Sequence, residues 1–164
     1  MSKTKQLSLS SDLLVTLAAI VDEVISKNKL NKKTNIDLEP TTVIFSGGDE
    51  DAKKQSIKLL SFLLDQKLKK VIVDEVVSKY IGETEKNITK LFKQAQKKDF
   101  ILFFDEADAL FGKVTSSNDK YANQEVSYIL GLNKIFNGLV IFYASKKIVG
   151  NAKLKNLFQY IIQL

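Results

Sequence analysis

Short runs of consecutive apolar residues alternate along this chain with segments of helical periodicity. Five runs predict β-strands, because they are rich in β-branched or aromatic residues and are bounded by turn-forming residues. These predicted strands are Thr41–Phe45, Lys70–Asp74, Phe100–Phe104, Leu139–Tyr143 and Tyr160–Leu164. The predicted strand Phe100–Phe104 shows no polar alternation, which is typical of a parallel strand with both faces covered.

Apolar residues at helical spacing predict helices between these strands. In Thr84–Lys98, the side chains of Ile88, Leu91, Phe92 and Ala95 fall on one face. The other predicted helices run from the cap at Ser10-Ser11-Asp12 to about Lys27, and over Lys53–Leu64, Tyr121–Asn137 and Ala152–Leu157. Alternating strands and helices predict an α/β fold with a five-stranded, mostly parallel sheet sandwiched by helices.

The length of 164 residues suits a single core domain. We expect residues 1–40 to form an N-terminal helix and a polar connector, Asn28 to Pro40, and residues 41–164 to form the core. No apolar stretch is long enough for a membrane span, and no signal peptide is recognisable, so no membrane partner is expected. The absence of cysteine fits a cytoplasmic location.

The composition excludes several kinds of chemistry. With no Cys and no His, the chain has no disulfides, no thiolate or imidazole metal ligands and no imidazole base. All 25 basic residues are lysines, and the net charge is +6. The lysines are scattered, and without arginine the chain lacks the bidentate group that reads guanine, which disfavours nucleic acid as a partner.

The strongest chemical signal is a buried strand that ends in acids. Four apolar residues, Ile101 to Phe104, precede Asp105 and Glu106. Open α/β sheets bind ligands at the carboxyl ends of their strands, where Asp105 could hold Mg²⁺ and Glu106 could orient or deprotonate a water. The plainer alternative is that these acids face solvent or cap the following helix.

The segment after the first strand, Ser46 to Ser56, is the candidate phosphate loop. The pattern G-x-x-x-x-G-K-[ST] fits in two registers, Gly47 to Lys53 or Gly48 to Lys54, and neither register completes it. Three acids, Asp49-Glu50-Asp51, stand where a polyanion would bind. Each would repel a phosphate charge at about 5 Å by roughly 1–3 kcal/mol.

Three longer stretches resemble the AAA ATPase family, and within it the AAA ATPases of bacterial contractile injection systems. They are Val77 to Asn87, Ile101 to Lys113 and Tyr121 to Val126, and the resemblance covers about Thr41 to Leu164. The resemblance implies a P-loop NTPase-like core that binds ATP and Mg²⁺. It also implies polypeptide substrates and assembly with other AAA subunits.

The resemblance assigns roles residue by residue. Asp105 becomes the metal ligand, Glu106 the catalytic carboxylate and Ser145 the sensor after the fourth strand, where the family usually has Asn. The nucleotide would meet Gly47, Gly48, Lys53 and Lys54. A pore loop that grips polypeptide would consist of Lys79, Tyr80, Ile81 and Gly82. An exposed Tyr suits this role, although Tyr80 could instead pack on the domain's own surface.

Departures from the family pattern point to a non-catalytic member, a pseudoenzyme. The phosphate loop is degenerate, the chain has no arginine finger, and the helical lid after the fifth strand is expected to be absent. We therefore expect weak or absent ATP and Mg²⁺ binding and a function through contacts with a protein partner. The alternative is an ATP-binding protein or a slow ATPase that couples hydrolysis to protein remodelling.

Overall fold

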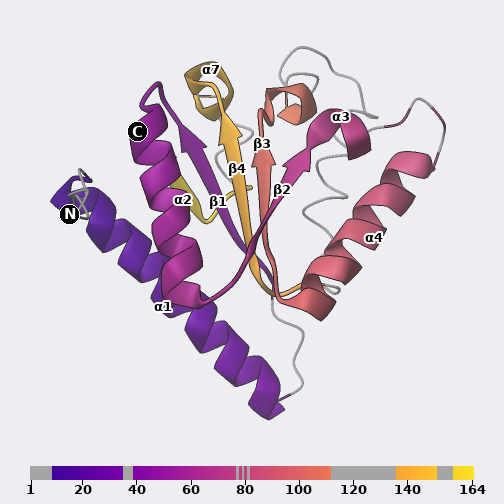
Figure 1. Ribbon diagram of the computed structural model, residues 1–164, viewed down its shortest axis with the longest axis horizontal. Helices are drawn as coiled ribbons and strands as arrows, with labels where there is room; N and C mark the ends of the chain where they lie inside the picture. Colours follow the sequence, from indigo (N-terminus) through magenta and orange to yellow (C-terminus); the bar gives the residue numbers. More distant parts are fainter. Residues whose placement is uncertain are drawn as a thin grey trace, which may run out of the picture.

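The chain folds around one five-stranded sheet (Figure 1). The computed structural model describes residues 9–34, 39–76, 78, 80, 82–111, 136–150 and 157–164. The strands are β1 (Thr41–Ser46), β2 (Leu68–Ile72), β3 (Ile101–Asp105), β4 (Leu139–Ala144) and β5 (Tyr160–Gln163). Their order across the sheet is β2-β3-β4-β1-β5, and all four pairings are parallel. The predicted α/β fold is confirmed.

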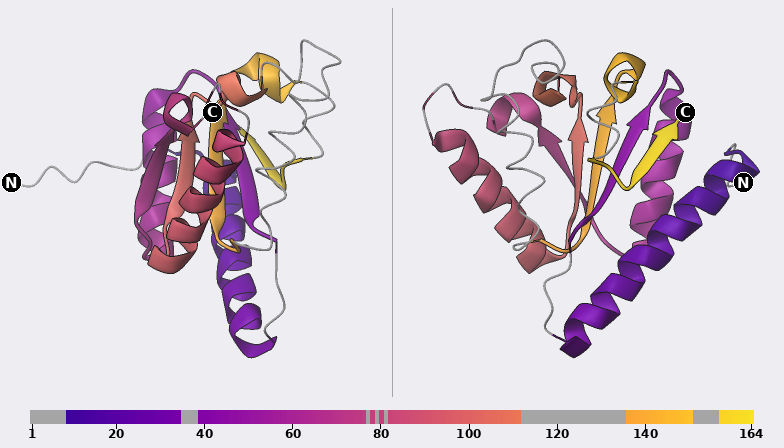
Figure 2. Two further views of the ribbon diagram at one scale, coloured as in Figure 1. Left: turned by 90° about the vertical axis from the view of Figure 1, so that its right-hand side faces the viewer. Right: turned by 180° about the vertical axis from the view of Figure 1, so that it is seen from behind.

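Helices cover the sheet and carry the chain between parallel strands. They are α1 (Ser11–Thr34), α2 (Glu50–Leu64), α3 (Val73–Val76), α4 (Glu83–Lys98) and α7 (Lys146–Val149). Because the strands point the same way, the segments that follow β1, β3 and β4 meet at one edge of the sheet, the upper edge in Figure 1. The sheet ends at β5, which lies beside β1 (Figure 2, right).

Both faces of the three central strands, β3, β4 and β1, are buried, as the unbroken apolar runs predict, whereas the edge strands β2 and β5 are largely exposed. Successive residues of a strand point to opposite faces, so Phe103 packs with α1 and α2 while Phe104 packs with α4. On the α4 side, the Phe104 and Phe142 rings stack with centroids 5.0 Å apart. Residues 101–104 contribute to the two cores in turn, which explains why no polar position interrupts this strand.

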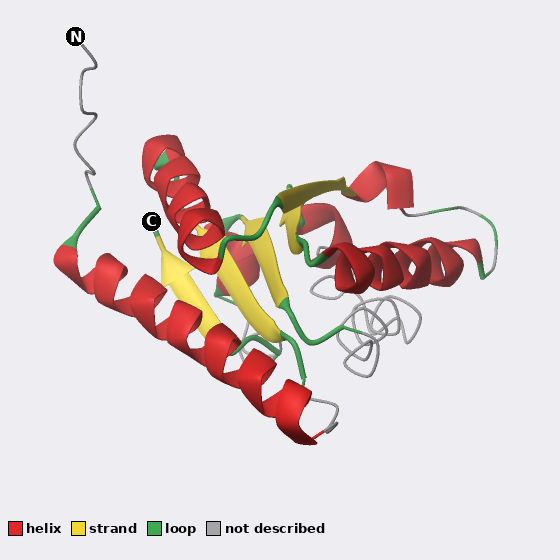
Figure 3. Cartoon of the chain, turned by 60° about the horizontal axis from the view of Figure 1, so that its bottom comes forward, coloured by secondary structure: helices red, strands yellow, loops and turns green. Residues whose placement is uncertain are grey.

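Helix α1 belongs to the same core as the sheet. Leu17, Ile20 and Val24 on α1 are fully buried in a cluster that includes Val43 and Phe45 of β1. Figure 3 shows α1 as a long helix along one side of the sheet. Helix α1 is therefore packed on the sheet.

Several predicted boundaries are wrong. Helix α1 continues to Thr34 instead of ending near Lys27, and two lysines in its last turn complement the helix dipole. Strand β2 ends at Ile72, because the chain turns into α3 at Val73. Helix α2 begins at Glu50, three residues before the predicted start, and α7 was not predicted.

Two predicted helices cannot be compared with the structure over most of their length. Tyr121–Asn137 lies outside the described residues except for its last two residues, which are not helical. Ala152–Leu157 lies outside them except for Leu157, which forms a turn.

Candidate functional site

The strand-end acids occupy a strained turn. Asp105 is the last residue of β3, and its side chain is 18% exposed. Glu106 is exposed and adopts a left-handed backbone conformation, φ 54°, which costs a non-glycine residue about 1–2 kcal/mol. The N–H of Glu106 donates to Asp105 Oδ1 over 3.0 Å, which helps to hold this turn. The predicted pair is thus adjacent at the carboxyl edge, with one half-buried and one exposed carboxylate.

A third acid, Asp108, joins the ends of β3 and β4. Its two carboxylate oxygens both lie 3.1 Å from the N–H of Ser145, which directly follows β4. The N–H of Ala107 donates to the carbonyl of Tyr143 over 2.9 Å. The sequence pattern predicts no role for Asp108, and only its place in the acid-rich run Asp105 to Asp108 could have suggested one. Asp108 places Ser145 at this edge of the sheet.

The loop after β1 depends on Gly47. Its φ is 119°, and a Cβ at this position would collide with the carbonyl of Leu164. The N–H of Leu164 donates to Ser46 over 2.7 Å, and the hydroxyl of Tyr143 donates to the carbonyl of Gly47. The backbone of Leu164, directly after β5, and a side chain from β4 therefore hold this loop closely. Gly48 has no atom near its Cβ position.

Helix α2 is capped by its own acid. Asp49 is the N-cap residue, and its side chain accepts from the N–H of Ala52 over 2.9 Å. The N–H of Lys53 donates to the carbonyl of Asp49 over 3.0 Å. Glu50 and Asp51 lie in the first turn, where negative charge complements the helix dipole. The three acids that precede Lys53 thus form the cap and first turn of a regular helix.

Lys53 lies at the centre of the site. Its side chain is 10% exposed, and its Nζ is 3.0 Å from Glu50 and 3.6 Å from Asp105 Oδ1. The same ammonium lies 4.1 Å from the centre of the Tyr143 ring. Burial acts to lower the pKa of Lys53, but the hydrogen bond to Glu50 and the charge of Asp105 outweigh it and raise the pKa.

The structure brings together only one of the two candidate lysines with the strand-end acid. Lys54 is exposed on α2, whereas Lys53 faces Asp105. Of the two registers, Gly47 to Lys53 is therefore the one that places its lysine beside Asp105. A further lysine, Lys70 of β2, reaches Asp105 Oδ2 over 3.1 Å, a contact that the sequence pattern does not predict.

The predicted pore loop lies between α3 and α4, and two of its residues are described. Tyr80 is 73% exposed, so it does not pack on the domain surface. Gly82 has φ 81° and is the N-cap residue of α4. Ser78 Oγ donates to Glu83 over 2.6 Å and accepts from the N–H of Tyr80 over 3.2 Å. Lys79 and Ile81 lie outside the described residues.

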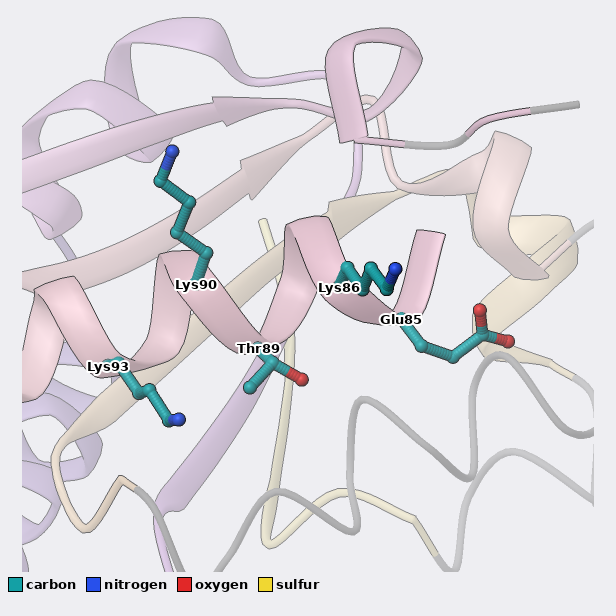
Figure 4. A pocket seen from close by; sticks show the side chains of 5 residues that line it. All are labelled: Glu85, Lys86, Thr89, Lys90 and Lys93. Carbon is teal, nitrogen blue, oxygen red and sulfur yellow. The ribbon is translucent and has the colours of Figure 1, made fainter. Parts of the chain in front are cut away.

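A separate hollow of about 430 Å³ lies against α4 (Figure 4). Among the described residues, the side chains that line it come from this helix: Glu85, Lys86, Thr89, Lys90 and Lys93. None of the strand-end residues contributes to it, so we place the candidate site at the sheet edge, where the buried lysine and the acids meet. Within the described ranges, no group of three or more acidic side chains is arranged to hold a metal ion.

A parallel five-stranded sheet that brings a lysine and an acid together at its carboxyl edge is consistent with the core of a P-loop NTPase. The sequence profile of the AAA family, the ATPase family associated with various cellular activities, matches residues 43–156. This span is more than half of the chain, and the chain therefore belongs to the AAA family. Members of this family generally bind ATP together with Mg²⁺.

Several AAA proteins are similar to parts of this chain. The AAA family ATPase y4kL of Sinorhizobium fredii is 32% identical over 100 residues, which are 61% of this chain and 28% of that protein. The vesicular-fusion protein SEC18 of Saccharomyces cerevisiae is 33% identical over 88 residues, 44% of this chain and 12% of that protein. A proteasome-associated ATPase of Kribbella flavida is 35% identical over 100 residues, 55% of this chain and 16% of that protein.

The matched region is a minor part of each relative. The chain spans less than a third of the length of these three proteins. Among the helices of the described residues, none combines the length and the apolar character required to cross a bilayer.

Proposed function

We propose that this chain is a non-catalytic AAA domain that acts through protein contacts, with a nucleotide site closed by its own side chains. The observation that carries the proposal is the position of Lys53. Its ammonium is buried between Glu50 and Asp105 and lies over the Tyr143 ring, so the charge that would meet a phosphate is already compensated.

The backbone amides at the start of α2 support the same proposal. A working phosphate loop directs successive N–H groups at the phosphates. Here the N–H of Ala52 donates to the Asp49 carboxylate, and the N–H of Lys53 donates to the Asp49 carbonyl. The carboxylate of Asp49 thus occupies a place at this helix N-terminus that an anion would otherwise take. These residues do not fit Mg·ATP, and we derive no hydrolytic step from them.

The other parts of a hydrolytic site also favour the proposal. Glu106 is exposed, and the amide of Ser145 is bound to Asp108. The sequence contains no arginine that could act as a finger, a group worth about 10³–10⁵ in rate where it operates. The chain therefore lacks two parts of a hydrolytic site, a complete phosphate loop and an arginine finger.

Tyr80 is the side chain that we propose contacts a partner. It is an exposed aromatic residue whose N–H donates to Ser78, and aromatic side chains supply large contact area with few torsions to immobilise. By similarity to a vesicular-fusion protein and a proteasome-associated ATPase, we propose a polypeptide as the partner and assembly with other AAA subunits. The link to a contractile injection system and the cytoplasmic location remain proposals that rest on the sequence.

A second candidate function is weak ATP binding or slow hydrolysis. The observation in its favour is that Lys53, in the register of a phosphate loop, lies 3.6 Å from Asp105, the acid placed to bind Mg²⁺. Displacement of Glu50 from Lys53 would free the ammonium for a phosphate. The two candidates differ in one measurable quantity, the affinity for Mg·ATP.

A titration of the full chain with a fluorescent ATP analogue and Mg²⁺ separates them. We expect no saturable binding tighter than about 100 μM, which corresponds to roughly 5.5 kcal/mol. Lys53→Ala is the test variant, and Lys54→Ala, one residue along on the exposed side of α2, is its matched control. Tighter binding that is lost in Lys53→Ala and kept in Lys54→Ala would reject the proposal. Phosphate release that Glu106→Gln abolishes would reject it as well.

A further inference from the structure

Both carboxylate oxygens of Asp105 face lysine side chains. Lys53 from α2 lies 3.6 Å from Oδ1, and Lys70 from β2 lies 3.1 Å from Oδ2. The Asp105 side chain is only 18% exposed, and a carboxylate in that position is costly to bury without a compensating charge. Two ammonium groups from different elements supply that charge.

The sheet register explains how Lys70 reaches this carboxylate. Ile72 is the β2 residue paired with Asp105, and Lys70 is two positions earlier on the same side of the strand. Lys70 is therefore the diagonal neighbour of Asp105, a separation that a long side chain can bridge. The Lys70 side chain as a whole remains 60% exposed while its ammonium contacts the acid.

An acid at this strand end in a P-loop NTPase holds Mg²⁺, an ion of charge 2+. In this chain two groups of charge 1+ occupy both oxygens of the same acid. An incoming metal ion would have to displace at least one lysine and would meet the repulsion of the other.

We propose that Lys70, together with Lys53, supplies to Asp105 the positive charge that Mg²⁺ would otherwise supply. The charge of the Asp105 carboxylate is then compensated without a metal ion. The inference deepens the proposed function, because it names the residue that excludes the metal from the site. Lys70 acts here as a positioning residue on Asp105.

The adjacent residue of the strand provides a matched control. Lys69 is also exposed, but it points to the opposite side of β2 and makes no ion pair with any residue that the structure describes. The variants Lys70→Glu and Lys69→Glu change the net charge equally. Only the first places a second carboxylate beside Asp105.

The experiment measures thermal unfolding of the full chain in EDTA and in Mg²⁺. The wild-type midpoint should be the same in both. In EDTA, Lys70→Glu should melt about 3–6 °C below Lys69→Glu, because like charges then meet at Asp105. About 10 mM Mg²⁺ should recover at least half of that loss, because the paired carboxylates offer the oxygen ligands that this ion prefers. A Lys70→Glu/Asp105→Asn double variant should recover stability in EDTA and lose the response to Mg²⁺.

Three results would overturn the inference: equal midpoints for the two single glutamate variants, no Mg²⁺ response in Lys70→Glu, or a wild-type midpoint that Mg²⁺ raises. Each is independent of the nucleotide titration. ATP binding by the wild type would reject the proposed function, whereas the Lys70 variants report on the acid with no nucleotide present.

Discussion

The phenol of Tyr160 on β5 donates a hydrogen bond of 2.6 Å to Glu23 on α1, across 137 positions of sequence. Glu23 also forms an ion pair with Lys27 over 2.8 Å, one turn along the helix. This contact fastens the N-terminal helix to the last strand of the sheet. The candidate site is thereby connected to α1, since Leu164, directly after β5, also holds the loop after β1.

The Tyr160–Glu23 contact predicts a loss of stability in alkali. The hydrogen bond with Glu23 and then burial raise the pKa of Tyr160 to about 12. An unfolded tyrosine ionises near pH 10, so the stabilisation is complete below about pH 10 and is lost as the pH rises through about 12. Tyr160→Phe should lower the free energy of unfolding by about 1 kcal/mol at pH 7.

Denaturant unfolding at neutral and alkaline pH checks this prediction. The difference between wild type and Tyr160→Phe should shrink as the pH approaches that at which the phenol ionises in the folded protein. The absorbance of the phenolate provides an independent reading of that pKa. A difference that stays constant throughout this range would contradict the assigned hydrogen bond.

Gly47 and Gly48 should respond in opposite ways to the same substitution. Gly47→Ala places a Cβ against the Leu164 carbonyl at a φ of 119°, so it should cost at least about 2 kcal/mol. Gly48→Ala meets open space and should change stability by less than about 0.5 kcal/mol. Chemical denaturation of both variants tests the pair, and equal effects would refute the close approach at Gly47.

Asp108→Asn should loosen the junction between β3 and β4. An amide offers one oxygen in place of the two that now accept from the Ser145 N–H, so we expect a loss of about 1 kcal/mol. The specific readout is hydrogen exchange, which should become faster at the Ser145 amide. Glu106→Gln, an exposed acid two residues earlier, is the control and should leave that exchange rate unchanged.

Tyr80→Ala should weaken polypeptide binding without lowering thermal stability, because the side chain is 73% exposed. We expect the affinity for a labelled unfolded polypeptide to fall by roughly fivefold or more, as for a contact residue at an interface. Phe62→Ala is the matched control, since Phe62 is an aromatic residue of α2 with 78% exposure. Equal losses of binding in the two variants would show that Tyr80 has no special role.

The sequence predicted the elements whose pattern reports burial directly. The run from Ile101 to Phe104 contains no polar residue because its residues enter the two cores in turn, and α4 has a clear apolar face. The predicted boundaries that are wrong lie where the sequence has no periodic apolar residues to mark the end of a helix. Helix α1 continues beyond its last buried residue, and α2 begins at Glu50, directly after its acidic cap Asp49, rather than at Lys53.

The sequence by itself determined the alternation of strands and helices, the acids after β3 and the two lysines that compete for the phosphate position. Only the tertiary structure decided that Lys53 and not Lys54 meets Asp105, that Lys70 joins it, and that Asp108 binds Ser145. The spacing of apolar residues along the sequence indicates which face of a helix or strand is buried. The strand order β2-β3-β4-β1-β5 determines which distant side chains become neighbours, and no local pattern contains that order.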